Sequence, residues 1–517
     1  MADRNKVGSS TLLRMPDDIV GRILKCEVLL FTDLLRFREV CRKFNDVVKS
    51  DDVWREKFFQ RWPNLLFRYG ADTDSSCNWL DEFKHRHIVG REVLSIVSDL
   101  SSKLYLQDIY ILSADELPDL FQQMKSDLRY AEFIVDELMS LLNDTERERK
   151  LTMKFYAQKL LTAAQEIILT EQVKLYTRLP LQKQLLEKGA TLLAQWCQPT
   201  KIYMMNEITN QIDRLAFDVK QEIRSTLLEH PIVNTSGLIS YLTEDLWLSE
   251  ESKQILLAIN KVLFEDKQFH GAQAEGANND PFNSYLDKVL FRRTGSLDAL
   301  CILYSAIARR LGVKCEPVRA NRLMLKWKEY LDVTDSSYTY IDVFDGGKFL
   351  SFEELRESQH LDGNSLNVVT SIEVLSRIAE NLVNIGGLQR QVGHDISNSY
   401  CFPGALKFLL LLDPDDVASK LSLIEWYIKR DINLHDCIST LKDMVDNEQA
   451  QGGSNNLLTT AEKGLNKESR LIARKITAKR RSKPSKVIFS VGDITRKKRY
   501  FISCIIVLSE EFRIIQR

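Results

Sequence analysis

The stretch 290-LFRRTGSLDALCILYSAIARRLG-312 decides the fold of the middle of this chain. The turn Thr294-Gly295-Ser296 predicts the start of a helix, and the middle of that helix, Leu300–Tyr304, is apolar on every side, which indicates burial at the centre of a domain. A thiol at the first helical position would lie in the positive end of the helix dipole, which favours a thiolate. That position holds Leu297, and the one cysteine of the helix, Cys301, comes a turn later.

Strand-like segments follow this helix at 314–320, 322–331 and 338–344. The turn Asp345-Gly346-Gly347 then leads into Lys348–Ser351, as in a tight hairpin. One helix buried against a short antiparallel sheet is an α+β core.

The remainder of the chain is predicted to be helical, so the fold class is mainly α and multidomain. Residues 12–62 form three short amphipathic helices that start near Met15-Pro16, Thr32-Asp33 and Asp51-Asp52. Three helices of this size bury a small core, so the block is expected to lean on a partner. We expect irregular helices over 63–115 and a helical bundle over 116–198.

The second half of the chain has its own divisions. Within the core region, helical segments are predicted at 205–230, 235–245 and 252–265. The predicted regions are the helical block 12–62, a helical linker and bundle 63–198, the α+β core 199–386, a helical repeat 387–448, a basic flexible linker 449–486 and an incomplete β segment 487–517.

Composition excludes several broad functions. The net charge is −1 over 517 residues, so nothing global favours nucleic acid or a membrane. Nine cysteines are scattered singly without zinc-ligand spacing, which favours free thiols in the cytoplasm and/or nucleus and predicts no metal site. No signal segment or membrane-spanning apolar run is seen, and no pattern indicates a cofactor.

The segment 12-LLRMPDDIVGRILKCEVLLFTDLLRFREVCRKFNDVVKSDDVW-54 resembles an F-box. The matching positions are Met15-Pro16, Ile23-Leu24, Leu34-Leu35, Val40-Cys41-Arg42 and Trp54. The resemblance implies docking to the Skp adaptor and, through it, to a cullin–RING ubiquitin ligase. The residues expected to contact the adaptor are Pro16, Ile19, Ile23, Leu24, Leu30, Leu34, Val40 and Trp54.

The quoted helix and its surroundings resemble the SirB-type, transglutaminase-like family. The shared motifs are Asn283–Leu286, Arg292–Gly295 and Ala308–Gly312, with 340-YIDVFDGGKFLS-351 as a further one. Active members of such families place a cysteine at the helix start, a histidine on the next strand and an aspartate on the strand after, because imidazole activates the thiol and a carboxylate orients the imidazole.

By this resemblance the three positions fall on Leu297, Arg322 and Asp342, so only the aspartate is kept. Leucine forms no nucleophilic anion and arginine is effectively never deprotonated. We therefore predict a non-catalytic scaffold, with Cys301 as a core cysteine, Asp342 paired with Arg322 or another base, and a groove able to bind a peptide.

The end of the chain is basic, with 14 lysines and arginines against two acidic residues between Lys463 and Arg499. The run 479-KRRSK-483 is a solvated linker, a nuclear signal or a phosphate-binding stretch. The segment 489-FSVGDITRKKRYFISCIIV-507 resembles the first strands of the YccV-like, hemimethylated-DNA-binding domain. Closing such a barrel takes further strands, so we expect a truncated domain, which argues against DNA binding.

These observations favour a substrate-recognition subunit of a Skp–cullin–F-box ubiquitin ligase that binds protein substrates and makes no bonds itself. A thiol-dependent acyltransferase or hydrolase is the first alternative, but it needs a histidine, and none lies between His270 and His360. The second alternative is a DNA-binding protein acting through the basic tail, which predicts a steep salt dependence.

Overall fold

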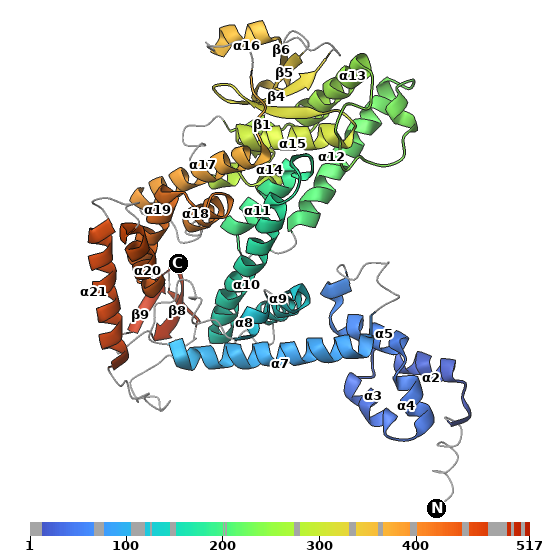
Figure 1. Cartoon of the computed structure of the whole chain (residues 1–517). Helices are drawn as coiled ribbons and strands as arrows, with labels where there is room; N and C mark the ends of the chain where they lie inside the picture. The colour runs from blue at the N-terminus through green and yellow to red at the C-terminus, as the bar shows by residue number, and fades with distance from the viewer. Residues whose placement is uncertain are drawn as a thin grey trace, which may run out of the picture. The chain divides into compact units, whose positions relative to one another are not determined.

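The structure is a computed structural model of the 517-residue chain (Figure 1). It describes residues 13–66, 77–104, 119–124, 127–144, 151–199, 201, 204–272, 280–329, 338–359, 366–392, 401–446, 454–473, 494–497, 501–507 and 512–516. The chain divides into two compact units, one of residues 1–164 with 480–517 and one of residues 165–479. The mainly α, multidomain fold class is confirmed.

The first unit begins with four short helices where the sequence predicts three. They are α2 (Asp17–Leu24), α3 (Phe31–Arg38), α4 (Arg42–Val48) and α5 (Asp51–Arg61), followed by the 3-10 turn η1 (Pro63–Leu65). The predicted middle helix is wrong as one piece, because Cys41 is extended, with φ −161° and ψ 166°, and separates α3 from α4. Apolar residues recur three and four positions apart on both sides of this break, so the sequence pattern does not reveal that the helix ends there.

The core of this helical block is aromatic and continues into the next helix, α7 (Trp79–Leu104). Trp54 is buried and donates its indole N–H to the carbonyl of Val48 at 2.7 Å. The ring of Trp54 lies 5.0 Å from that of Phe83, and the ring of Phe58 lies 5.6 Å from that of Trp79. The block therefore packs directly on α7.

The expectation of irregular structure over 63–115 is wrong for 79–104, which form one continuous helix. The buried face of this helix includes Arg86 and Gly90, which are not apolar side chains. The apolar periodicity expected of an amphipathic helix is therefore interrupted in the sequence. The Arg86 guanidinium donates to Asp136 at 2.6 Å and to Glu137 at 2.9 Å, both on α9 (Leu128–Asn143). A Cβ on Gly90 would lie 2.9 Å from both Arg86 and Glu137, so only glycine leaves room for the ion pair.

The helices predicted over 116–198 are confirmed, whereas their packing as one bundle stays a prediction. After the short α8 (Asp119–Gln123), α10 (Leu151–Thr177) runs across the boundary of the two units, and α11 (Leu186–Cys197) follows the 3-10 turn η3 (Leu181–Lys183).

The second unit continues with α12 (Met204–Thr226), η4 (Pro231–Asn234), α13 (Ser249–Asn260), the π-helix η5 (Lys261–Asp266), η7 (Pro281–Asn283) and α14 (Leu286–Arg292). The helix predicted at 235–245 is wrong, because this segment forms bends and turns. Its backbone bonds instead to the end of the central helix: Ile239 N–H donates to Arg310 and Leu246 N–H to Gly312, both at 3.0 Å.

The quoted stretch forms the central helix, α15 (Leu297–Arg310), and its predicted burial is confirmed. The antiparallel sheet that follows has the order β3 (Cys315–Arg319), β4 (Leu323–Lys328), β5 (Tyr338–Asp342) and β6 (Lys348–Leu350). Leu325 pairs with Ile341, and Tyr340 pairs with Leu350. A separate parallel pair joins β1 (His270–Gly271) to β2 (Thr294–Gly295).

The two faces of the sheet have different cores, as the alternation of side chains along a strand requires. Leu323, Leu325 and Trp327 of β4 join the large core around α15. Met324, between them, joins a small cluster with Tyr340 and with α16 (Phe352–Gln359). The sheet thus lies between α15 and α16, and the predicted α+β core is confirmed.

A buried ion network holds the carboxyl end of α15. Glu187 of α11 accepts hydrogen bonds from both Arg309 and Arg310, and Arg310 also donates to Asp213 of α12. The side chains of Glu187 and Arg310 are each 6% exposed, so these charges are almost out of water. The network ties three helices together at one point.

Paired helices follow, as predicted: α17 (Ser371–Val392), α18 (Cys401–Leu412), α19 (Val417–Ile428) and α20 (Leu434–Asp446). The predicted linker 449–486 is wrong in part, because α21 (Ser454–Ala473) packs on α19 and α20. Its stripe of Leu457, Leu458, Ala461 and Leu465 is short and lies among polar residues, which favours a linker on composition alone.

The last described elements are the antiparallel strands β7 (Ile494–Lys497), β8 (Phe501–Val507) and β9 (Phe512–Gln516). These strands lie within the β segment predicted at 487–517, whereas its first residues, 487–493, and the basic run 479–483 lie outside the described residues. Among the helices of the described segments, none is long and apolar enough to cross a membrane.

We predict that Glu187→Ala lowers the free energy of unfolding of the second unit by about 3–5 kcal/mol, because it leaves two largely buried guanidinium groups short of a partner. Urea denaturation followed by tryptophan fluorescence measures this loss. The matched control, Glu222→Ala, removes a carboxylate that pairs with the half-exposed Lys261 and leaves the midpoint near that of the wild type. Equal effects of the two substitutions would contradict a structural role for the buried network.

Candidate functional site

The amino end of α15 is the position at which the transglutaminase-like resemblance places a nucleophile. Ser296 caps the helix, with its hydroxyl accepting the N–H of Ala299 at 3.3 Å. Leu297 follows as the first helical residue and packs, half-buried, against the core. An alkyl side chain therefore occupies the one place where the helix terminus would favour an anion.

Arg322 and Asp342 form an ion pair, as the sequence predicts. Arg322 lies in the turn just before β4, and Asp342 is the last residue of β5. The Asp342 carboxylate also accepts the N–H groups of Phe344 and Asp345, at 3.2 and 3.3 Å, and so caps the 3-10 turn η9 (Val343–Asp345). Because it binds one guanidinium group and two backbone N–H groups, the Asp342 carboxylate stabilises the local structure.

Cys301 lies one turn inside α15 and is buried. Its Sγ lies 3.9 Å from the carbonyl oxygen of Leu323 on β4, to which the thiol donates. Burial raises the pKa of Cys301 well above its ordinary value, and the carboxylates of Asp298 and Asp342 raise it further. The thiol form is therefore strongly favoured, the opposite of what a nucleophilic cysteine needs.

Asp298 is a buried carboxyl group that sequence reasoning missed. Its Oδ2 lies 3.9 Å from the guanidinium Nε of Arg377 on α17, while Oδ1 has no hydrogen-bond partner among the described residues. Burial raises the pKa of Asp298, and Arg377 opposes the shift. The sequence offered only an acidic residue in a first helical turn, which is ordinary for any helix.

The two histidines of this region have structural contacts. His270 is exposed on β1, with Nε2 3.0 Å from the hydroxyl of Thr294. His230 is buried, and its Nδ1 accepts the N–H of Ile232 at 3.1 Å. Within the described ranges, no group of three histidine, cysteine or acidic side chains is arranged to hold a metal ion.

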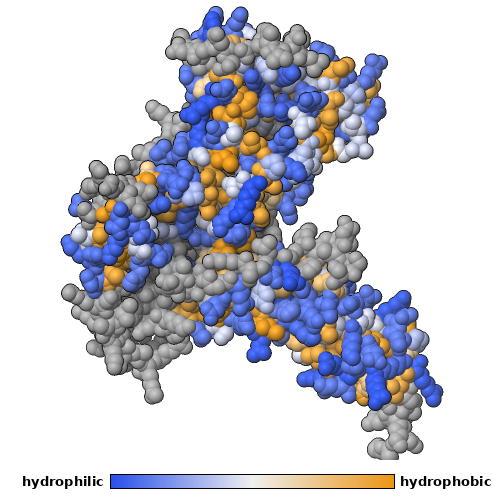
Figure 2. Space-filling model, in the orientation of Figure 1, coloured by the Kyte–Doolittle hydropathy of each residue, from blue (hydrophilic) through white to orange (hydrophobic). Residues whose placement is uncertain are grey.

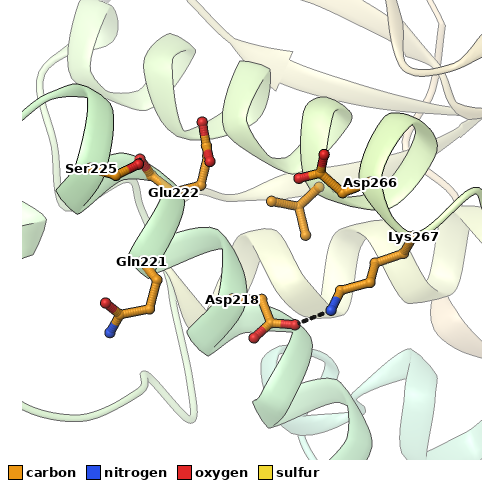
Figure 3. A pocket seen from close by; sticks show the side chains of 7 residues that line it. Asp218, Gln221, Glu222, Ser225, Asp266 and Lys267 are labelled. Atoms are coloured by element: carbon orange, nitrogen blue, oxygen red, sulfur yellow. Dashed lines mark hydrogen bonds and ion pairs between the residues drawn. The ribbon is translucent and has the colours of Figure 1, made fainter.

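A shallow pocket lies between α12 and η5 (Figure 3). Its lining residues are Asp218, Gln221, Glu222, Ser225, Val262, Asp266 and Lys267. Lys267 points toward Asp218 across the pocket, with Nζ and Oδ2 2.6 Å apart, and Glu222 pairs with Lys261. Two of its three carboxylates are thus neutralised by lysines of the same chain.

The F-box-like helices divide the predicted adaptor-contact residues into two sets. Five of them are exposed, namely Pro16, Ile19, Ile23, Leu30 and Val40. Leu24, Leu34 and Trp54 are buried in the block itself, so their assignment to the contact surface is corrected: they hold the helices together. Three further apolar side chains that were not among the predicted contact residues are exposed, namely Leu13, Val28 and Leu35.

The periodic spacing of apolar residues does not separate these sets, because both follow it; Figure 2 shows apolar and polar side chains interspersed over α2–α5. Knowing which side of each helix faces its neighbours requires the tertiary structure.

Comparison with known families gives the class of the chain. Residues 12–60 match the F-box-like family, and residues 206–381 match the Transglutaminase-like superfamily. The chain therefore joins an F-box-like domain to a transglutaminase-like domain, as the two resemblances predict.

The chain is also similar to curated proteins, in part along most of its length. The chain is 29% identical to F-box only protein 21 of Pongo abelii over 96% of its own length and 79% of that protein, and 28% identical to F-box only protein 21 of Homo sapiens over the same shares. A shorter match, 31% identical over 142 residues, joins 25% of the chain to 48% of a UPF0162 protein of Xylella fastidiosa. No solved structure gives a significant match.

We predict that Asp342→Ala costs more stability than Arg322→Ala. Removing the half-exposed arginine costs about 1 kcal/mol or less, whereas removing the buried carboxylate also frees two backbone N–H groups and costs about 2 kcal/mol more. Urea denaturation of both variants and of the double variant gives the coupling between them. Additive effects of the two substitutions would contradict the pairing.

We predict that native Cys301 reacts with iodoacetamide at pH 8 about 100-fold or more slowly than the exposed Cys26. Because burial raises the pKa of Cys301, its thiolate fraction at pH 8 is negligible and increases only at higher pH. Mass spectrometry of the labelled peptides over time measures both rates. Comparable rates at the two cysteines would instead indicate an activated thiol in α15.

Proposed function

We propose that this chain is the substrate-recognition subunit of a Skp–cullin–F-box ubiquitin ligase. The observation that carries the proposal is the set of apolar side chains left uncovered on the F-box-like helices. Val28 is 90% exposed and Leu30 60%, in the turn between α2 and α3, and Ile19 and Ile23 are each 41% exposed, four residues apart on α2. Large apolar groups gathered on one small helical block favour a protein partner.

The packing of the F-box-like block on α7 supports the same function. Trp54 and Phe58 contact α7 through their rings, and the Arg86 guanidinium lies 4.8 Å from the ring centre of Trp62 while pairing with α9. A buried ion pair among aromatic rings permits little bending between the block and α7. A ligase subunit needs such a fixed base, because it acts by holding a substrate at high local concentration near the ubiquitin carrier.

The transglutaminase-like domain then serves as a non-catalytic scaffold that binds protein substrates. Leu297 stands at the nucleophile position, Arg322 stands at the histidine position and binds Asp342, and the thiol of Cys301 is buried. We place the protein in the cytoplasm or nucleus, where its isolated cysteines would remain reduced. The YccV-like resemblance of 487–517 stays a prediction.

We predict that the double variant Ile23→Glu, Leu30→Glu binds the Skp adaptor at least about tenfold more weakly in co-purification. Both side chains are exposed, so the variant keeps the wild-type circular dichroism and melting temperature. The matched control is Leu228→Glu, which changes a leucine of the second unit that is more exposed, at 76%. Unchanged binding by the folded double variant would overturn the proposed function.

A further inference from the structure

Three buried titratable side chains meet where α11, α14 and α18 converge in the second unit. Cys197 is the last residue of α11, Cys401 is the first residue of α18, and Tyr285 directly precedes α14. Their exposed fractions are 6%, 2% and 2%. Neither the F-box-like surface nor the amino end of α15 uses this cluster.

The two cysteines are in direct contact although 204 positions apart in sequence. The Sγ of Cys197 lies 3.8 Å from the backbone oxygen of Cys401, and the Sγ of Cys401 lies 3.7 Å from the oxygen of Leu382. The hydroxyl of Tyr285, buried without a hydrogen-bond partner among the described residues, interacts electrostatically with both thiols.

The backbones of α11 and α18 approach each other closely at this point. A Cβ added to Gly404, one turn into α18, would lie 2.7 Å from the oxygen of Trp196 and 3.3 Å from the Cα of Cys197. A disulfide needs Cα atoms about 4.4–6.8 Å apart. The contact between the Sγ of Cys197 and the backbone oxygen of Cys401, together with this close approach of the two helix ends, makes such a separation attainable.

The two thiols differ in their electrostatic surroundings. Cys401 stands at the amino end of a 12-residue helix, and its interaction with the neighbouring Cys197 thiol lowers the pKa of its own thiol. Cys197 stands at a helix carboxyl end, and burial raises its pKa. Cys401 is therefore the better nucleophile, and Cys197 the thiol positioned to respond second.

We propose that Cys197 and Cys401 form a reversible disulfide when the chain meets a hydroperoxide. The Cys401 thiolate attacks one peroxide oxygen, the O–O bond breaks, and a sulfenic acid and hydroxide form. The Cys197 sulfur then attacks the Cys401 sulfur, the S–O bond breaks, and its proton leaves with the hydroxyl as water. Two thiols are oxidised by two electrons in total, and one hydroperoxide is reduced.

The disulfide would brace the transglutaminase-like domain at both ends. The matched region, 206–381, lies between the two cysteines in sequence. A cross-link between α11 and α18 restricts the unfolded chain across this whole region, so the oxidised form is expected to melt about 5–10 °C higher. This effect is independent of the proposed ligase function.

The test uses the purified full-length chain, treated with hydrogen peroxide, blocked with N-ethylmaleimide and digested without reductant. We expect a peptide pair linked through Cys197 and Cys401, lost on dithiothreitol treatment, together with the higher melting temperature. Cys401→Ser and Cys197→Ser each abolish the link. The matched control Cys437→Ser, which changes a buried cysteine of α20 whose thiol donates to Ile432, leaves the link intact.

The wild-type digest alone decides the proposal, even if a serine variant fails to fold. The proposal is overturned if the digest shows that Cys26 is oxidised while Cys197 and Cys401 are both still reduced. Sulfinic or sulfonic acid at Cys401 without a cross-link, or a link from either residue to a different cysteine, overturns it as well.

Discussion

The architecture of the second unit depends on complete burial of one helix, α15. A helix apolar on every side must be covered on every side, and here α11, α12, α13 and the sheet supply the cover. Burial is most demanding at the carboxyl end of α15, because the charged side chains of Arg309 and Arg310 are largely removed from water there. The Glu187 carboxylate of α11 forms ion pairs with both guanidinium groups. Separating α11 from α15 would leave buried charges unpaired, which is costly.

The same burial decides the chemistry at the other end of α15. Cys301 is surrounded by the core and donates its thiol hydrogen to Leu323, so it stays protonated. The Asp342 carboxylate binds the guanidinium of Arg322, whereas a catalytic triad would need an imidazole there. The polar groups at this transglutaminase-like site make structural contacts. Exposed apolar side chains lie instead on the F-box-like helices, which the rings around Trp54 and Phe83 hold against α7.

Sequence patterns predicted those elements whose local signal agrees with their burial. The strands beside α15 are rich in apolar and aromatic residues and lie next to a clear turn signal, and both glycines of the Asp345-Gly346-Gly347 turn have positive φ. The incorrect predictions for 79–104 and 454–473 have a common cause. The helix over 79–104 carries Arg86 in its buried stripe, and 454–473 shows only a narrow apolar stripe, so in both cases distant partners complete a face that looks polar in isolation.

The sequence by itself determined the central buried helix, the short sheet beside it, the F-box-like start and the alkyl side chain at position 297, because each is set by residue identity at fixed local spacing. Only the tertiary structure decided which apolar residues of the F-box-like block remain exposed, which of the possible bases pairs with Asp342, and that Cys197 contacts Cys401. Those facts depend on contacts between residues far apart in the chain, and local periodicity carries no information about which distant surface covers a given side chain.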